Sequence, residues 1–372
     1  MKKVIVYFGI IRYDTENAMC QRAEGIKRLI IASGYIPKII AVNKDVARNK
    51  WRKRNDEVYE INAPSTSLEW LQSCISARDI KGILQDIGIN NIKTVIMADY
   101  RFKPMKDIAK FCEKHKINYT VDIMDWFVSN ETLNSKIKKF DNDLRMKKFY
   151  PKVKRRIYIC SSYNNVLGIT KNTRVIPGVT FDETKNSVSK KNDKVVIFFA
   201  GNPGKYCEKE RIDWIINAFK NKRISDRFLF YIAGVEKKEF IENNYPGEDI
   251  NPNIIFLGRI AHEKCISMLR RSDFSMIIRE DNHLSKFGFS TKIGEALANG
   301  IPVIVTNTSD NKKYIQNGIN GYIIECSEKA VENILLDLSI INTKRFDQLK
   351  ESTFFNNPLS YRNYLVDFKQ VI

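Results

Sequence analysis

The chain has 372 residues, of which 43% are hydrophobic and 28% charged, a globular composition whose length favours two domains over one. Its formal net charge of +19 predicts attraction to a polyanion or an anionic surface. Seven cysteines lie far apart without CxxC spacing, which argues against a disulfide framework and predicts a cytoplasmic protein. The short apolar run at the N-terminus is interpreted as a first strand, and no uncharged stretch is long enough to cross a bilayer.

Short apolar runs alternate with helical patterns along the first half of the chain. Strands that are apolar on both faces and separated by helices are typical of a parallel sheet covered on two sides. We expect strands at 3–9, 38–42, 93–99 and 118–124, and helices at 16–34, 67–89 and 104–116.

The alternation lapses at residues 181–193, which hold almost no apolar side chains and are typical of a linker. It then starts again. Strand-bearing segments are expected at 194–204, 227–234, 253–259, 273–281, 302–306 and 320–325, and helices at 211–220, 262–272 and 291–298.

The predicted fold class is therefore α/β, with two doubly wound Rossmann-like domains facing a central cleft. The domains are expected at 1–176 and 194–350, joined by a linker at 177–193, and the last segment, 358–372, is expected to be helical. Ligands of open parallel sheets bind at the carboxyl ends of the strands, so the cleft between the two domains is the expected active site.

Two loops in the second half follow strands and lead into helices, where backbone N–H groups and the helix dipole favour anions. In "AGNPGKYCEKER" (200–211), Gly201 and Gly204 let the backbone approach a ligand, and Lys205 or Lys209 can supply charge. A Gly-Asn-Pro-Gly turn also needs no ligand at all. In "LGRIAHEK" (257–264), Arg259 ends a strand and is either a ligand or a solvated side chain.

A third loop, "SKFGFSTKIGEALANGIPVIVTNT" (285–308), turns helical at Thr291 and stops at Gly300. Ser290 or Thr291 can cap the helix, and Lys292 and Glu295 share its exposed face. A nucleotide diphosphate across this helix start would find Lys292 for phosphate charge and Glu295 as an acceptor for two ribose hydroxyls. The alternative is a surface Lys–Glu pair worth a few tenths of a kcal/mol.

The stretch "FSTKIGEALANGIPVIVTNTSDNKKYIQNGINGYII" (289–324) resembles the donor-site signature of GT-B glycosyltransferases of the group 1, family 4 type. It carries the Lys-x-x-Glu-Ala helix, the A-x-G-x-P-V turn and a downstream N-G-x-N-G in order. The segment 201–219 resembles the family's glycine loop and maps its phosphate lysine onto Lys209, and "VDIMDWF" (121–127) resembles an acidic-Trp strand end of polysaccharide-assembling relatives.

The resemblance implies a retaining hexosyltransferase with a nucleotide-sugar donor, either a UDP- or a GDP-sugar, an acceptor domain at 1–176 and a donor domain at 194–350. It also implies that the C-terminal helix crosses back onto the first domain. No cofactor and no divalent metal are expected. Basic side chains and helix N-termini that point at the diphosphate can stabilise its negative charge in place of a metal ion. The three histidines are scattered along the sequence and do not form a ligand set.

The residues expected in the site fall into two groups. The expected catalytic residues are Asp122, Asp125, Lys209 and Lys292, with the two aspartates orienting the acceptor unless they are merely helix caps or turn formers. The expected donor-binding residues are Gly201, Asn202, Gly204, Lys205, Arg259, Arg279, Phe289, Ser290, Thr291 and Glu295.

One position departs from the family pattern. Many members have Glu eight positions before the ribose-binding Glu, where this chain has Phe287. The contact of that Glu with the transferred sugar is then absent, or comes from Arg279, Asp281, Asn282 or the backbone around Gly288.

The segment "RMKKFYPKVKRR" (145–156) gathers seven basic residues around Phe149 and Tyr150. Basic side chains mixed with aromatic ones suit a lipid headgroup layer, although such runs are also common as solvated faces. We therefore expect an enzyme on the inner face of the cell membrane that elongates a lipid-linked glycan, as in capsule or O-antigen assembly.

Alternative functions remain. A nucleotide-sugar epimerase shares the two-domain architecture and needs no membrane-facing acceptor surface. A nucleic-acid-binding protein would explain the charge, but the chain has no RNP-type strand, zinc framework or recognition-helix pattern, so no nucleic-acid partner is expected. A Rossmann dehydrogenase is disfavoured because the Gly-x-Gly-x-x-Gly fingerprint after the first strand is missing.

Overall fold

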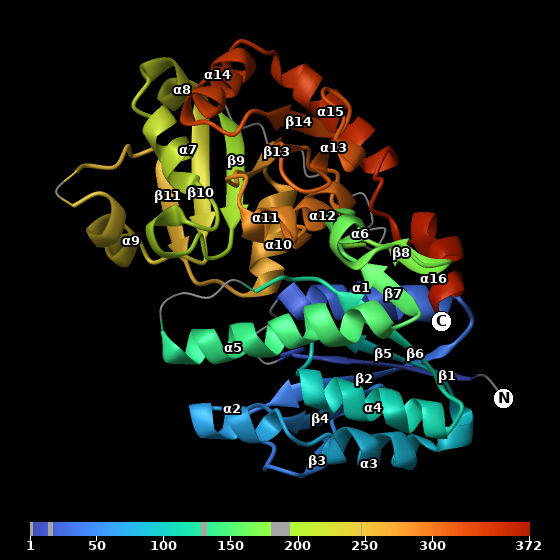
Figure 1. The fold of residues 1–372 in the computed structure, drawn as a ribbon. Helices are drawn as coiled ribbons and strands as arrows, with labels where there is room; N and C mark the ends of the chain where they lie inside the picture. The colour runs from blue at the N-terminus through green and yellow to red at the C-terminus, as the bar shows by residue number, and fades with distance from the viewer. Residues whose placement is uncertain (1–2, 14–17, 128–131, 180–193, 247) are drawn as a thin grey trace. The chain divides into compact units, whose positions relative to one another are not determined.

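The structure is a computed structural model that describes residues 3–13, 18–127, 132–179, 194–246 and 248–372 (Figure 1). It divides into two compact units. The first contains Met1–Val179, Phe287–Phe289 and Tyr361–Ile372, and the second contains Thr180–Lys286 and Ser290–Ser360. Most of the expected linker, residues 180–193, lies outside the described residues.

The described part of the first unit contains an eight-stranded sheet in the order β3-β4-β2-β1-β5-β6-β7-β8. All neighbouring strands are parallel except β3 and β4, which are antiparallel. Strand β1 is buried along its whole length and β5 at every residue except Lys93, as expected for a sheet covered on both faces. The strands are β1 (Val4–Gly9), β2 (Ile36–Asn43), β3 (Trp51–Lys53), β4 (Val58–Asn62), β5 (Ile92–Ala98), β6 (Asn118–Ile123), β7 (Arg155–Tyr158) and β8 (Asn172–Val175).

Helices cover both faces of this sheet. On one face α1 contacts α16, and on the other α3, α4 and α5 contact one another in succession. The helices are α1 (Ala18–Ala32), α2 (Ser67–Ser73), α3 (Arg78–Ile87), α4 (Phe102–Lys114), α5 (Leu133–Leu144), α6 (Ser162–Leu167) and α16 (Leu365–Val371). The single helix expected at 67–89 is thus two helices, because α2 ends at Cys74 and the segment "CISA" does not continue it.

The C-terminal helix belongs to the first unit. Asp367 of α16 pairs with Arg174 of β8 at 3.0 Å, and the Thr120 hydroxyl of β6 donates a hydrogen bond to the Val371 carbonyl. Phe368 and Val371 are fully buried. Packing and two polar contacts, one of them between residues 251 positions apart in sequence, therefore hold the C-terminal helix on the first unit.

The described part of the second unit contains a six-stranded parallel sheet in the order β11-β10-β9-β12-β13-β14. This is the second doubly wound unit that the sequence predicts. Its strands are β9 (Val195–Ala200), β10 (Phe228–Ala233), β11 (Ile254–Gly258), β12 (Phe274–Ile277), β13 (Val303–Thr306) and β14 (Gly321–Ile324). Its helices are α7 (Ile212–Ala218), α8 (Lys222–Arg227), α9 (Lys237–Asn244), α10 (His262–Arg270), α11 (His283–Lys286), α12 (Thr291–Ala298), α13 (Asn311–Tyr314), α14 (Glu328–Ser339) and α15 (Thr343–Phe355).

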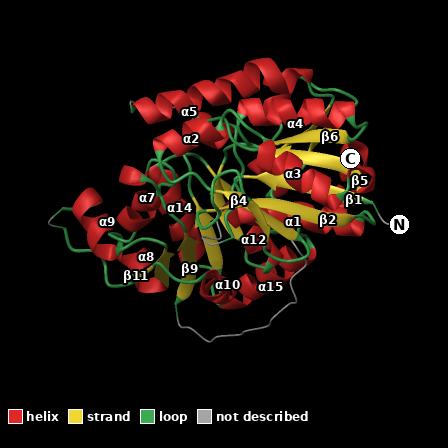
Figure 2. Cartoon of the chain, turned by 90° about the horizontal axis from the view of Figure 1, so that it is seen from below, coloured by secondary structure: helices red, strands yellow, loops and turns green. Residues whose placement is uncertain are grey.

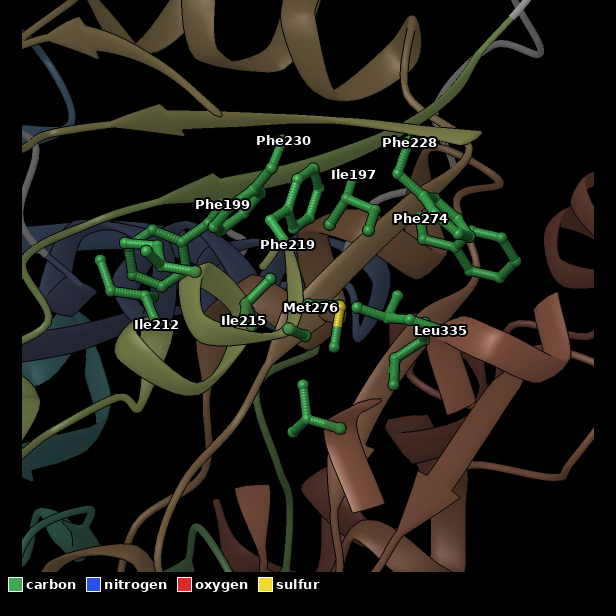
Figure 3. Close-up of a cluster of buried hydrophobic side chains, with 14 of the residues drawn as sticks. Ile197, Phe199, Ile212, Ile215, Phe219, Phe228, Phe230, Phe274, Met276 and Leu335 are labelled. Atoms are coloured by element: carbon green, nitrogen blue, oxygen red, sulfur yellow. The ribbon is translucent and has the colours of Figure 1, made fainter. Parts of the chain in front are cut away.

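The core of the second unit lies between its sheet and α7, α8 and α14, and is rich in phenylalanine (Figure 3). Phe199 of β9, Phe230 of β10 and Phe274 of β12 are buried there, and the rings of Phe219 and Phe230 lie 6.2 Å apart. Large aromatic side chains bury much apolar area with little loss of conformational freedom, so this core fixes β9 and the loop that follows it.

Figure 2, in which strands and helices are coloured separately, shows that the structure is a mixture of sheets and helices throughout. Among the described residues, no helix is long and apolar enough to cross a membrane.

Candidate functional site

Three of the expected site residues meet at the carboxyl edge of the second sheet. Gly201 directly follows β9, Arg279 lies two residues past β12, and Lys292 is the second residue of α12. Because the carboxyl ends of parallel strands share one edge of a sheet, these segments converge. They meet around Glu210, a residue that the sequence did not single out.

The Glu210 carboxylate is fully buried and accepts hydrogen bonds from two cations. Lys292 Nζ lies 2.8 Å from Oε1 and 2.7 Å from Oε2. Arg279 donates to Oε1 from Nη2 at 2.9 Å and from Nε at 3.2 Å. Charge-assisted bonds of this kind are the strong ones, so the three side chains form one rigid cluster.

The electrostatics of the cluster leave an excess of positive charge. Burial raises the pKa of Glu210, but the charges of Lys292 and Arg279 outweigh this and lower the pKa below its usual value. Burial lowers the pKa of Lys292, Glu210 opposes the change, and the nearby Arg279 adds to it. Two cations therefore share one carboxylate, and an additional anion at this edge of the sheet would be stabilised.

Gly201 makes room for Lys292. A Cβ atom at position 201 would lie 2.7 Å from Lys292 Cε and 3.0 Å from its Nζ, far closer than non-bonded carbon atoms come. Gly201 also has a φ of +143°, which L side chains rarely adopt. The glycine is thus required for Lys292 to cross the loop and reach Glu210.

A pocket of about 460 Å³ opens next to this loop. Its wall includes four of the expected donor-binding residues, namely Asn202, Gly204, Lys205 and Arg259. The Asn202 side chain accepts a hydrogen bond from the Gly204 N–H at 2.9 Å, and the Arg259 N–H donates to Glu236 at 3.2 Å. The volume falls in the range of ordinary small-molecule sites.

The start of α12 differs from the expectation in its cap. Ser290 occupies the N-cap position, but its hydroxyl makes no capping hydrogen bond and is buried without any hydrogen-bond partner. Thr291, the other expected cap, is the first residue of the helix and is half-buried. A buried, unpaired hydroxyl at a helix N-terminus is an unusual feature that a bound ligand would resolve.

Lys292 and Glu295 are not on an exposed face, so that expectation is wrong. Both are half-buried, and Lys292 turns inward onto Glu210. Burial raises the pKa of the Glu295 carboxyl group, and the charges of His262 and Lys292 oppose the rise. The alternative of a solvated surface Lys–Glu pair is thereby excluded.

Two other residues expected in the site do not contact the Glu210 carboxylate. Lys209 is exposed, although its charge is near enough to lower the pKa of Lys292. Phe289 is buried and groups with the first unit, as does Phe287, whose ring lies 4.8 Å from Trp126 and 5.2 Å from Tyr163. Phe287 is therefore a packing residue.

Asp122 of the first unit is also a packing residue. Its carboxylate is fully buried, with Arg22 donating to it at 2.7 Å and 2.9 Å and the Tyr7 hydroxyl at 2.9 Å. Both carboxylate oxygens of Asp122 accept hydrogen bonds inside the first unit, so the expected role in orienting an acceptor does not fit this side chain. Asp125 is exposed just past β6, and its backbone N–H donates to Asp99, a second residue that the sequence did not single out.

The basic segment 145–156 is only partly exposed. The expectation of exposed aromatic side chains is wrong, because Phe149 and Tyr150 are buried after a π-helical turn (Arg145–Phe149). Arg145 and Arg156 are buried as well, hydrogen-bonded to Asp99 and to backbone carbonyls respectively. The basic residues of the segment that are exposed are Lys147, Lys148, Lys152 and Lys154.

Comparison with known proteins agrees with this geometry. Residues 180–348 match the family model for glycosyl transferases group 1. No curated protein sequence matches the chain significantly.

Solved structures match over the whole chain at low sequence identity. A sucrose-phosphate synthase (tll1590) from Thermosynechococcus elongatus has 11% identity and a TM-score of 0.72, covering 99% of this chain and 98% of its own. Anabaena Alr3699/HepE in complex with UDP and glucose has 13% identity and a TM-score of 0.65, covering 99% and 98%. The lipopolysaccharide outer core galactosyltransferase WaaB, in its apo form, has 14% identity and a TM-score of 0.60, covering 98% and 99%.

The fold and the sequence signature together define a GT-B protein, which confirms the predicted fold class. Residues 180–348 thus match the group 1 glycosyltransferases, a family of enzymes that transfer a sugar from a nucleotide-sugar, as the resemblance implied.

Proposed function

We propose that the second unit binds the nucleotide-sugar with the Gly201–Lys205 loop and the start of α12. Lys292 and Arg279 supply positive charge to the diphosphate, and Glu295 accepts hydrogen bonds from the ribose hydroxyls. The observation that carries the proposal is the passage of Lys292 over Gly201 onto the buried Glu210, which leaves one cation in excess at the carboxyl edge of the sheet. Lys205 and Arg259, which line the pocket beside this loop, and the exposed Lys209 add further positive charge.

The reaction follows from where charge develops. As the bond between the anomeric carbon and the diphosphate breaks, the leaving group gains negative charge. Cations held in place before the reaction stabilise that state without reorganising, and so lower the barrier. We propose retention at the anomeric carbon, which the family resemblance implies.

The acceptor is a hydroxyl of a growing lipid-linked glycan of the cell surface, such as a capsule or O-antigen repeat, bound by the first unit. WaaB, a galactosyltransferase of the lipopolysaccharide outer core, is among the proteins of similar fold. Asp125, exposed at the carboxyl end of β6, is the candidate for orienting the acceptor.

Peripheral attachment to the inner face of the membrane fits the surface of the first unit. Lys147, Lys148, Lys152 and Lys154 are exposed, and cations near an anionic leaflet are attracted to it. Helix α2 buries none of its residues, and Leu68 on it and Phe140 on α5 are 65% and 64% exposed. Exposed apolar side chains beside basic ones are typical of a surface that lies on lipid.

A thermal-shift screen against UDP-, GDP- and dTDP-sugars tests the proposal. We expect one nucleotide class to raise the melting temperature, and the product made from that donor and an added glycan acceptor to keep the anomeric configuration on NMR. Formation of an isomerised sugar from the donor alone would select the epimerase instead. Salt-steep binding of arbitrary DNA without any nucleotide-sugar response would select a nucleic-acid-binding protein.

A further inference from the structure

A second pocket, of about 320 Å³, lies at the carboxyl edge of the first sheet. Its wall is formed where β1, β2, β4 and β5 end, by Ile10, Val42, Ala63 and Asp99. The side chains of α2 and α5 complete it. Such a position is where parallel sheets bind ligands, and the volume fits one sugar residue with a substituent.

Arg101 is buried in the wall of this pocket without a hydrogen-bonding partner for two of its nitrogens. It is only 4% exposed, and its Nε and Nη1 atoms make no hydrogen bond. It is the N-cap residue of α4, and its guanidinium carbon lies 4.7 Å from the centre of the Tyr100 ring. A buried cation that lacks hydrogen bonds costs free energy, which an anionic ligand would recover.

The acidic groups of the pocket do not neutralise Arg101, because other groups occupy them. Arg145 pairs with Asp99 at 3.0 Å and with Asp141 at 3.3 Å. Asp99 also accepts from the Tyr150 hydroxyl at 2.9 Å, and Asp141 from the Phe102 N–H at 3.0 Å. Lys138, exposed at the rim, adds a further positive charge. The pocket therefore has a net attraction for an anion.

Apolar and aromatic groups line the rest of the pocket. Trp70 of α2 and Phe127, which is 37% exposed, are aromatic residues of its wall, and Ile10 and Val42 are aliphatic ones. Aromatic side chains next to a buried cation that has no acidic partner match a sugar ring that bears one negative group.

We propose that this pocket binds an anionic group of the acceptor, a phosphate or a carboxylate, at Arg101, with the adjoining sugar ring against Trp70 and Phe127. The inference rests on the proposed function, in which the first unit holds the acceptor. A phosphate would come from the carrier of a lipid-linked glycan, and a carboxylate from an acidic sugar within the glycan.

Calorimetric titration of the full chain with phenyl phosphate, phenyl β-D-glucuronide and the neutral phenyl β-D-glucoside tests the proposal. We expect one anionic probe to bind at least tenfold more tightly than the glucoside, and Arg101→Gln to remove about a tenfold or larger factor from that affinity. Preference for the phosphate identifies the carrier as the source of the anion, and preference for the glucuronide identifies an acidic sugar. Lys103→Gln, an exposed lysine of the same helix, is the matched control and should bind like the wild type.

Three results would overturn the proposal. These are equal affinity for all three probes, wild-type affinity in Arg101→Gln, and anion binding that is lost in Lys292→Ala but kept in Arg101→Gln, which would place the anion in the second unit. If Arg101→Gln does not fold, Arg101→Lys is tested in its place. Weaker binding of the anionic probe with unchanged glucoside binding would then support the proposal. Unchanged binding of the anionic probe would overturn it. None of these results would contradict the proposed donor site of the second unit, because that proposal is tested by nucleotide binding.

Discussion

Lys292 Nζ lies within 2.8 Å of both carboxylate oxygens of Glu210, a residue 82 positions earlier in the chain. The pair joins the start of α12 to the loop after β9. Because Glu210 is fully buried, its two cations stabilise the loop only while the carboxylate is present and charged.

Glu210→Gln is therefore expected to destabilise the protein by about 3 kcal/mol, since it leaves two partly buried cations without a counter-charge. The measurement is denaturant unfolding. Glu242→Gln, which breaks an exposed pair with Lys238 at 4.0 Å, is the control and should cost less than about 1 kcal/mol. Equal effects of the two substitutions would contradict the account.

The same pair predicts a pH dependence of stability. The pKa of Glu210 is lowered on folding below its ordinary value of 4.5, so its contribution is fully present above pH 4.5 and is lost as the pH falls through the lowered pKa. The difference in unfolding free energy between wild type and Glu210→Gln should thus shrink on acidification. A difference that stays constant between neutral pH and the acid limb would show that the carboxylate charge is not what stabilises the loop.

Gly201→Ala is expected to displace Lys292, because the new Cβ would lie 2.7 Å from its Cε. We predict at least a tenfold loss of nucleotide affinity together with a stability loss of about 1–3 kcal/mol from the positive φ. Gly318→Ala is the control, because position 318 has a φ of +76° but no atom within 4 Å of the new Cβ, so the substitution adds backbone strain without a steric clash. If both variants bind nucleotide like the wild type, Lys292 does not need the gap at Gly201.

How far the sequence predicts this site differs from residue to residue. The strand and loop positions follow from apolar patterning, and the helix stop at Gly300 is confirmed by its φ of +68°. Glu210 could not be picked out, because Glu208, Lys209 and Glu210 are consecutive charged residues and only the turn after β9 decides which one points inward. One signal in the sequence is that Glu210 lies two residues before the buried Ile212, and another is that it follows Lys209 in the Lys–acidic pair of the family pattern.

The misassigned residues of the first unit have a common cause. Asp122 finds its partner, Arg22, 100 residues away, and no local pattern shows that a strand-end aspartate is already paired. Phe149 and Tyr150 lie in a basic segment, but both rings are buried where a π-helical turn ends, an irregularity that the residue pattern does not reveal. Long-range pairing and helix irregularity are decided by tertiary packing.

The C-terminal helix provides a test of stability. Phe368→Ala should cost about 3–5 kcal/mol, because the side chain is fully buried in the first unit. Val366→Ala, at a position that is 72% exposed on the same helix, should be nearly neutral. Truncation after residue 355 is expected to lower the melting temperature for the same reason, and unchanged melting and turnover of the truncated chain would refute the prediction.

The exposed lysines of the first unit predict salt-sensitive membrane binding. Each Lys near an anionic leaflet contributes about 1 kcal/mol, so changing Lys147, Lys148, Lys152 and Lys154 to Gln should abolish co-sedimentation with anionic vesicles. The control changes the same number of exposed lysines in the second unit, Lys220, Lys222, Lys238 and Lys329. Equal partitioning of both variants would remove this surface from the account and favour a soluble acceptor.

The donor site around Lys292 is the central claim, and calorimetric titration with UDP and GDP tests it most directly. Lys292→Ala and Glu295→Gln should each lose about ten- to a hundredfold in affinity for the nucleotide that the wild type binds, because each removes one charge-assisted contact. Lys222→Ala, at an exposed position of α8, should bind like the wild type. Wild-type affinity for both nucleotides in Lys292→Ala and in Glu295→Gln would contradict the account.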